Sequence, residues 1–271
     1  MIEIPEAIIL AKQIEMELKG KRIKRITSGN SEDYDDNNFR MSFRGKTVEG
    51  AQGYGGKLHI GLSGDSGLWF ADGINIRYNK TGKSPKKYPT LLIEFDDASY
   101  LSFSVSLYGF FEGYTGRLEG WMAGYMGVAT DRPQVDSEEF NEEYFFEILK
   151  PLNHEKYTAK SFLATEQRIP GLGNGVLQDI LFNAGISPKR SLSTMSHSDF
   201  TDLYRSIKNT IHEMIDQGGR DVEKDIYGKS GGYKTRISRL TYQSPCFKCC
   251  GEIVRESYLG GNVYYCSSCQ K

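Results

Sequence analysis

The sequence predicts a two-domain α+β protein, in which an N-terminal helix and an antiparallel β-sandwich precede a helical domain that ends in a zinc-binding β-hairpin. Three observations lead to this prediction. Residues 22–128 consist of short alternating runs separated by Gly, Asn and Asp, and residues 139–217 carry helical periodicity. Four cysteines near the end of the chain form two close pairs. With 271 residues, 38% of them hydrophobic, the chain is long enough to bury two cores.

The first predicted element is a helix over residues 6–19. Pro5 suits the first helical position, and Gly20 suits the residue that ends a helix. The apolar residues that recur at helical spacing, and so predict one buried face, are Ala7, Ala11, Ile14 and Leu18.

Short apolar or alternating runs then predict the strands of the sandwich. The clearest are residues 57–62, 68–71, 90–95 and 99–105. The Gly-Tyr-Gly-Gly cluster at 53–56 predicts a turn where the backbone comes close to another part of the molecule.

A polar segment, residues 131–155, contains Pro133 and Pro151 and predicts a linker between the domains. Helices are predicted at about 139–149, 157–165, 175–184 and 198–217. The expected domains are 1–130 (β-sandwich), 131–155 (linker), 156–235 (helical) and 236–271 (zinc ribbon).

A glycine-rich turn, Ile-Pro-Gly-Leu-Gly-Asn at 169–174, joins two of these helices. Helices joined by such a turn make a helix–turn–helix type unit. The backbone N–H groups of the turn and of the helix that begins near Gly175 can bind a phosphate. An ordinary connection between helices fits the pattern equally well.

The cysteine pairs have the spacing C-x2-C-x16-C-x2-C, formed by Cys246, Cys249, Cys266 and Cys269. Four thiolates in a tetrahedron suit one structural Zn²⁺ ion, and such a site leaves no open position for catalysis. The alternative, two disulfides, is disfavoured because the N-terminus shows no secretory signal. Cys250 is not expected to be a ligand.

The net charge is only −1, but it is unevenly divided. Residues 1–155 contain 18 Lys and Arg against 24 Asp and Glu, and residues 156–271 contain 16 against 11. The C-terminal half is therefore the expected face for an anionic partner. Two basic stretches, 19–25 and 80–87, fit either nucleic-acid binding or solvated loops. We expect an intracellular, cytoplasmic and nucleoid-associated protein, because the sequence has no apolar run long enough to span a membrane and its cysteines are interpreted as reduced and metal-bound.

Several motifs together resemble one family. They are Glu-Ile-Pro-Glu at 3–6, Gly-Lys-Leu at 56–58, Pro-Gly-Leu-Gly-Asn-Gly at 170–175, Asn-Ala-Gly-Ile-Ser-Pro-Lys-Arg at 183–190, Gly-Gly at 218–219 and the ribbon that ends in Cys-Gln-Lys. With them the chain resembles the formamidopyrimidine-DNA glycosylase / endonuclease VIII family of base-excision repair. The resemblance covers nearly the whole chain and is most specific over 156–271.

The resemblance implies a monomeric two-domain clamp with a helix–two-turn–helix domain and a zinc hairpin. Double-stranded DNA lies in the cleft, and the damaged nucleotide is flipped out of the stack. The N-terminal amine attacks C1′, the base leaves, and elimination from the resulting Schiff base cuts the strand. An α-amine suits this step, because its pKa near 8 leaves an unprotonated fraction at neutral pH.

Residues of this chain match the family's motifs one by one. Glu3 matches the acid at the sugar, Glu6 the second acid beside it, and Lys57 a lysine that contacts phosphate beside the lesion. Asn174 matches the turn asparagine that, with backbone N–H groups such as that of Gly173, holds phosphate; Lys160 lies on the preceding helix. The alternative is that Glu3 and Glu6 only favour the helix dipole and that Lys57 is a surface residue.

The chain departs from the family at the nucleophile. The family uses an N-terminal proline exposed by removal of the initiator methionine, whereas the second residue here is Ile2. Because initiator Met is removed efficiently only before small residues, we expect Met1 to stay. The amine then lies up to about 3.5 Å further along the chain, whereas reacting groups tolerate displacements of about 1 Å.

Two contacts to DNA also differ. The family's hairpin carries an arginine at its tip, and the tip here reads Leu-Gly-Gly-Asn at 259–262, with Gly261 near the expected arginine, so a bidentate phosphate contact is lost. The family fills the space left by the flipped base from an Arg-Phe-Gly segment. The matching segment, 106–111, offers Leu107, Tyr108 or Phe110 as a wedge.

Three functional hypotheses follow. The first, which we favour because Glu3, Glu6 and Lys57 are retained, is a DNA glycosylase and AP lyase that acts on damaged, oxidised bases in duplex DNA. The second is a relative with weakened catalysis that binds damaged or abasic DNA. The third is an unrelated zinc-ribbon protein that binds RNA. We expect the choice of lesion to depend on the pocket and on the loop at 225–234, for which mobility is predicted.

Overall fold

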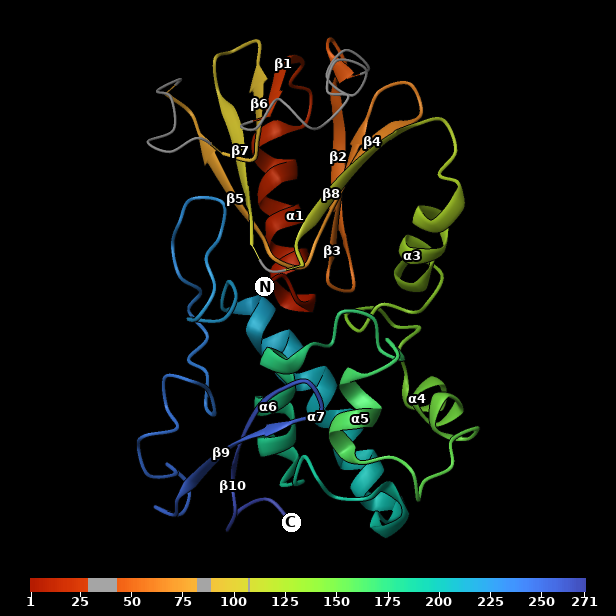
Figure 1. The fold of residues 1–271 in the computed structure, drawn as a ribbon, viewed down its shortest axis with the longest axis vertical. Coiled ribbons are helices and arrows are strands. Elements are labelled where there is room, and N and C mark those ends of the chain that lie inside the picture. The colour runs from red at the N-terminus through yellow and green to blue at the C-terminus, as the bar shows by residue number, and fades with distance from the viewer. Residues whose placement is uncertain (29–42, 82–88, 107) are drawn as a thin grey trace.

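The computed structural model describes residues 1–28, 43–81, 89–106 and 108–271. Two antiparallel four-stranded sheets form the upper part of the molecule in Figure 1. The first has the order β1-β6-β7-β5, made of β1 (Ile23–Ser28), β6 (Leu91–Phe95), β7 (Tyr100–Val105) and β5 (Ile74–Asn79). The second has the order β2-β3-β4-β8, made of β2 (Val48–Tyr54), β3 (Lys57–Leu62), β4 (Ser66–Ala71) and β8 (Phe110–Thr115). The predicted sandwich is confirmed.

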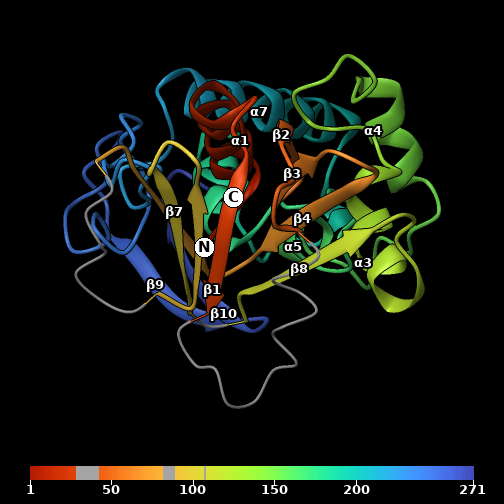
Figure 2. The same cartoon turned by 90° about the horizontal axis from the view of Figure 1, so that it is seen from above.

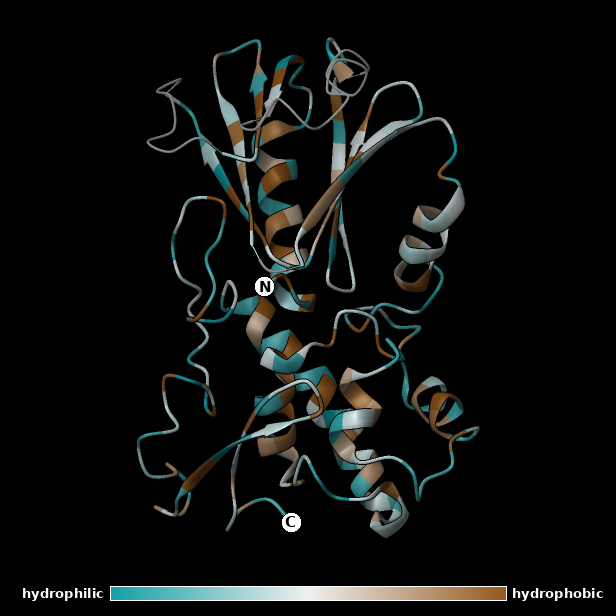
Figure 3. Cartoon of the chain, in the orientation of Figure 1, coloured by the Kyte–Doolittle hydropathy of each residue, from teal (hydrophilic) through white to brown (hydrophobic). Residues whose placement is uncertain are grey.

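Helix α1 (Ile4–Leu18) runs alongside both sheets (Figures 1 and 2). It begins two residues earlier than predicted, because Glu3 and Glu6 form a capping box and Pro5 occupies the first turn. Figure 3 shows hydrophobic residues concentrated along α1. One side of the helix joins the sandwich core, while Ile4 and Ile8 join the core of the helical domain. Helix α1 therefore links the two cores.

The helical domain contains α4 (Glu142–Leu149), α5 (Ala159–Ala164), α6 (Asn174–Ala184), the 3₁₀ turn η1 (Leu192–Thr194) and α7 (His197–Asp216). Helix α7 begins at a capping box formed by Ser196 and Asp199, and its apolar face packs on α6. Helix α4 lies within the segment predicted as a linker, and its Phe145 and Leu149 are buried in the domain core.

Among the described residues, the helix that follows β8 was not predicted. Helix α3 (Gly120–Thr130) follows β8, where we expected the strand pattern to continue to residue 128. Met122 and Met126 pack on Trp69 of the second sheet. Glycines at 120, 124 and 127 and apolar residues all round the helix left no helical periodicity to detect.

The segment after α7 contains the loop that we predicted to be mobile. Instead it is held on the sandwich, because the Ile226 side chain is fully buried in the sandwich core. The backbone N–H of Tyr78 donates to the carbonyl of Ile226 at 2.8 Å, and Arg77 Nη1 donates to the carbonyl of Asp225 at 3.0 Å. This loop is thus a second connection between the domains.

The predicted hairpin between the cysteine pairs is formed by β9 (Ile253–Tyr258) and β10 (Gly261–Cys266). Its inner residues pack on Phe182 of α6. Within the described residues, no helix is long and apolar enough to cross a membrane.

Candidate active site and DNA-binding residues

The N-terminus lies where the sandwich meets the helical domain (Figure 1). The Ile2 side chain is buried, and its backbone N–H donates to the carbonyl of Asp72 at 2.9 Å. Met1 is 54% exposed, and its α-ammonium group forms an ion pair with Glu223 at 3.0 Å. With Met1 in place, the nitrogen of Ile2 is an amide that is already hydrogen bonded. The free amine of the chain therefore belongs to Met1.

Glu3 and Glu6 are buried, and both lie beside the buried Arg220, which the sequence did not predict as a site residue. Arg220 donates from Nε to Glu6 Oε1 at 2.9 Å and from Nη2 to Glu6 Oε2 at 2.6 Å, and Nη1 lies 3.5 Å from Glu3 Oε2. The guanidinium is a donor-only group that stays charged in proteins. Arg220 therefore balances the charge of the two carboxylates.

Glu3 also caps helix α6. Its Oε1 accepts the N–H of Gly175 at 2.8 Å, and its Oε2 accepts the N–H of Val176 at 2.7 Å. Burial raises the pKa of Glu3, while Arg220 and the two N–H groups oppose the rise. The pKa of Arg220 is raised by the two carboxylates against the effect of its burial. The predicted anion site at the start of α6 is thus occupied by the protein's own carboxylate.

Nothing in the sequence marked Arg220 as buried. It follows Gly218 and Gly219, which end helix α7, and a charged residue at such a place is usually solvated. The one available signal was the presence of two carboxylates at the helix start that the fold would have to bury together.

Close backbone contact between two glycine-rich turns holds this arrangement. Gly55, with φ of +54°, leaves no room for a Cβ atom, which would lie 2.6 Å from the carbonyl oxygen of Pro170. A Cβ atom on Gly171, where φ is +76°, would lie 1.8 Å from the nitrogen of Gly56. The close approach predicted for residues 53–56 is confirmed, and its partner is the turn at 169–174.

Lys57, at the start of β3, is buried rather than directed to solvent. Its Nζ donates to the carbonyl of Tyr125 at 2.6 Å and lies 4.0 Å from the centre of the Tyr125 ring. The hydroxyl of Tyr125 donates to Asp72 Oδ2 at 3.1 Å, which puts Lys57 beside the residue that accepts the Ile2 N–H. Burial lowers the pKa of Lys57 to about 8, and Asp72 opposes the shift.

Two of the residues predicted to hold phosphate, Asn174 and Lys160, lie at the hairpin. Asn174 Nδ2 donates to the carbonyl of Asn262 at 2.6 Å, and Lys160 Nζ donates to the carbonyl of Tyr258. A Cβ atom on Gly261 would lie 3.4 Å from Asn174 Nδ2. Gly173, the residue before α6, lies against the Glu3 side chain. The hairpin tip thus adjoins both the asparagine and the lysine.

Of the two expected wedge residues that the structure describes, Tyr108 is the more exposed, at 86%. Its φ of +60° is unusual for a tyrosine and turns the chain sharply before β8. Leu107 lies outside the described residues, and Phe110 contacts the rings of Trp121 and Tyr125.

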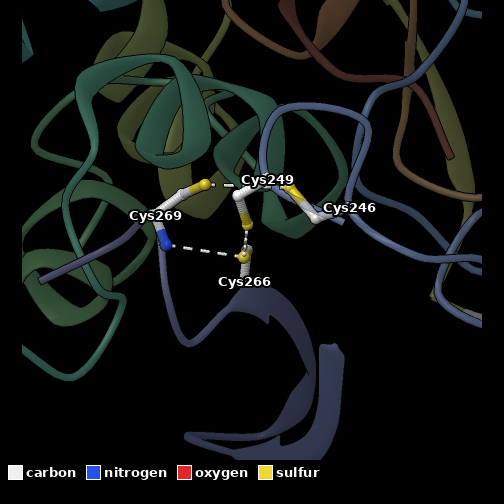
Figure 4. Close-up of side chains that lie close together, drawn as sticks. All are labelled: Cys246, Cys249, Cys266 and Cys269. Carbon is white, nitrogen blue, oxygen red and sulfur yellow. Dashed lines mark hydrogen bonds between the residues drawn. The ribbon is translucent and has the colours of Figure 1, made fainter. Parts of the chain in front are cut away.

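The sulfur atoms of Cys246, Cys249, Cys266 and Cys269 all lie within 4.8 Å of one another (Figure 4). The Sγ atoms of Cys246 and Cys269 lie 3.8 Å apart, and those of Cys249 and Cys266 lie 3.5 Å apart. Zn–S bonds of about 2.3 Å in a tetrahedron separate the sulfur atoms by about 3.8 Å, so the cluster fits one structural zinc ion. Cys250 does not belong to the cluster, as predicted.

Comparisons with known proteins agree with this geometry. Residues 132–225 match the formamidopyrimidine-DNA glycosylase H2TH domain. The chain is 26% identical to a formamidopyrimidine-DNA glycosylase of Shouchella clausii over 100% of this chain and 99% of that protein, and 30% identical to one of Bacillus subtilis over 56% and 55%.

Solved structures share the fold. A complex of Lactococcus lactis Fpg with abasic-site DNA has a TM-score of 0.84 at 21% identity, with 99% of each chain covered. A complex of a mutant of that protein with DNA containing Fapy-dG has a TM-score of 0.83 at 20% identity, with the same coverage. The hypothesis of an unrelated RNA-binding zinc ribbon is wrong, because the chain is similar to formamidopyrimidine-DNA glycosylases in sequence over its full length, in its H2TH domain and in its fold.

Proposed function

We propose that this protein acts in base-excision repair on duplex DNA that carries a damaged or missing base. In this proposal the DNA lies across the junction of the two domains, and the α-amine of Met1 forms a Schiff base with C1′ of the target nucleotide. Elimination from that Schiff base then cuts the strand, as an AP lyase does.

One observation carries the proposal: the free amine of Met1 lies at the domain junction (Figure 1), two residues before Glu3, whose carboxylate caps α6. A primary amine can form an imine with an aldehyde as readily as a secondary amine forms an iminium ion. In the proposal Glu3 acts at the sugar and Glu6 keeps Arg220 in place, which retains the carboxylates predicted as catalytic.

The DNA contacts in the proposal follow the same prediction. Phosphates are bound by Lys57, Lys160, Asn174 and the N–H of Gly173. Tyr108 enters the base stack. The hairpin tip at Gly261 lies along the DNA backbone and makes no charged contact with it. The limits of the domains also remain a prediction. They are 1–130 for the sandwich, 131–155 for the linker, 156–235 for the helical domain and 236–271 for the zinc ribbon.

A second candidate is a protein that binds damaged or abasic DNA without cutting it. The observation that favours it is the state of the terminus, where the Ile2 nitrogen is an amide bonded to Asp72 and the Met1 amine is paired with Glu223. These contacts engage both nitrogens, one as a hydrogen-bonded amide and the other in an ion pair.

Borohydride trapping separates the two candidates. Wild-type protein and Glu3→Gln are incubated with duplex DNA that contains one abasic site, and borohydride reduces any imine to a stable adduct. We expect an adduct with wild type and at least about tenfold less with Glu3→Gln. Tight binding without any adduct would reject the lyase, and absence of binding preference for the abasic duplex would reject both candidates.

A further inference from the structure

We infer that the substrate of this site is the abasic site itself, and that the protein cuts abasic DNA without excising damaged bases. The inference rests on the proposed Schiff-base chemistry of the Met1 amine. It follows from three features of the structure: the ion pairs of the buried acids, the position of the amine, and the attachment of the loop that follows α7.

The first feature concerns proton donation. Base excision needs a proton for the departing base or for the sugar ring oxygen, and the acids at the site are its natural source. Each oxygen of Glu3 accepts a backbone N–H, and Arg220 donates twice to Glu6. All of these partners are donors only, so they satisfy carboxylates and offer no acceptor for a carboxyl proton. These hydrogen bonds therefore favour the carboxylate form of Glu3, the form that accepts a proton, while burial opposes them and raises its pKa.

The second feature is the amine. Displacement of a base at C1′ requires the nucleophile to be aligned with the bond that breaks, and a displacement of about 1 Å is costly. The Met1 amine is one residue beyond the family's nucleophile, half exposed, and paired with Glu223. An abasic site is different, because its open-chain sugar presents a free aldehyde, which a nearby flexible amine can attack without displacing a base.

The third feature is the loop that we expected to read the damaged base. Ile226 is buried in the sandwich core, and Gln13 exchanges hydrogen bonds with this segment through Asp225 Oδ2 at 3.1 Å and the Ile226 N–H at 3.2 Å. Tyr227 donates to Glu17 of α1 at 2.8 Å. Residues 225–227 are therefore attached to the sandwich and α1, and these contacts would have to break before the three residues could fold over an extrahelical base.

The reaction balances with the groups present. The ammonium of Met1 gives a proton to Glu223 or to water, its nitrogen bonds to the aldehyde carbon C1′, and water leaves to form the imine. Glu3 takes a proton from C2′, the electrons of that C–H bond form a C2′–C3′ double bond, and the 3′-phosphate leaves with the C3′–O bonding pair. Water then hydrolyses the imine and releases the amine.

The test compares matched duplexes that differ only at one position, which holds an abasic site, an oxidised purine, a formamidopyrimidine or an oxidised pyrimidine. Released base, cut strand and borohydride adduct are measured for each. We expect cutting and an adduct with the abasic duplex, and base release from the other three at least about a hundredfold slower than the cutting of the abasic duplex. Base release from any of them within about tenfold of abasic cutting would overturn the inference and leave the proposed function intact.

Absence of any adduct with the abasic duplex would overturn the proposed function and this inference together. A chain extended by one glycine before Met1 identifies the amine, since trapping should fall at least about tenfold while binding of the abasic duplex is kept. Lys150→Arg, which removes an exposed amine at the end of α4, serves as the matched control and should trap as wild type does. Equal trapping by the extended chain would assign the reaction to another amine and overturn the inference.

Discussion

At the scale of single residues, the site is organised by Arg220 and its two carboxylates. The sequence predicted Glu3 and Glu6 as a pair at the start of a helix, and the structure buries both. A buried carboxylate without a partner is costly, so the arginine is what makes this burial possible. The pairing joins residues more than two hundred positions apart, and for that reason no local pattern revealed it.

Arg220→Gln should lower the free energy of unfolding by about 3–5 kcal/mol near neutral pH, because it leaves two buried carboxylates without a cation. Burial then holds the folded-state pKa of Glu3 above its unfolded value of 4.5. Protonation of Glu3 reduces this penalty, so the loss should shrink as the pH falls through the raised pKa of Glu3. Urea unfolding of the wild type and of Arg220→Gln at several pH values measures this loss of stability.

The matched control is Arg205→Gln. Arg205 is 65% exposed and lies 3.7 Å from Asp202, so its loss should change stability by less than about 0.5 kcal/mol. A loss for Arg220→Gln that is similar to the control, or that does not depend on pH, would contradict the role assigned to Arg220.

Lys57 predicts a pH dependence of DNA binding. Its pKa of about 8 means that the side chain loses its charge as the pH rises through that value. If the ammonium contacts a phosphate, the affinity of the wild type should fall over this range at fixed salt concentration. Lys57→Arg keeps its charge and should show a smaller fall. Equal pH profiles, measured by fluorescence anisotropy, would rule out the contact.

At the scale of elements, the patterns with clear periodicity were predicted well. Strand β3 was predicted with its observed limits, and α1, α6 and α7 to within two residues at each end. Helix α3 was missed because its glycines and uniform apolar character carry no periodicity. The attachment of the loop after α7 was missed because Ile226 is one apolar residue in a polar, glycine-rich segment, and its burial depends on a distant sheet.

Ile226→Ala tests this attachment. The side chain is fully buried in the sandwich core, so its truncation should lower the free energy of unfolding by about 2–4 kcal/mol. Tyr227→Phe, which removes only the hydrogen bond to Glu17 from the neighbouring, exposed position, should cost less than about 1.5 kcal/mol. The two losses are compared by urea unfolding, and equal small losses would mean that the loop is not held by the core.

The four-cysteine cluster at the hairpin predicts the zinc content of the protein. Purified protein should contain one zinc ion per chain, Cys250→Ser should keep it, and Cys249→Ser should lose it. Because the hairpin tip adjoins Asn174 and Lys160, Cys249→Ser should also weaken binding of the abasic duplex. Elemental analysis and anisotropy measure the two effects. Loss of zinc from Cys250→Ser would mean that the ligand set is wrong.

At the scale of the whole molecule, three sets of contacts join the two domains. Helix α1 contributes side chains to both cores, the turns at 53–56 and 169–174 are in backbone contact, and the loop after α7 is attached to the sandwich. The fold class followed from the sequence because composition and periodicity differ between the halves. The junction did not, since it depends on contacts between distant segments.

The central claim is that the Met1 amine is the group that reacts with abasic DNA. The most direct test is to reduce the complex with borohydride, digest the adduct with a protease and locate the modified residue by mass spectrometry, after the intact mass has established that Met1 is present. The account predicts a sugar remnant on the α-nitrogen of Met1. A remnant on Lys57 or another lysine, or no adduct at all with an abasic duplex that binds tightly, would contradict it.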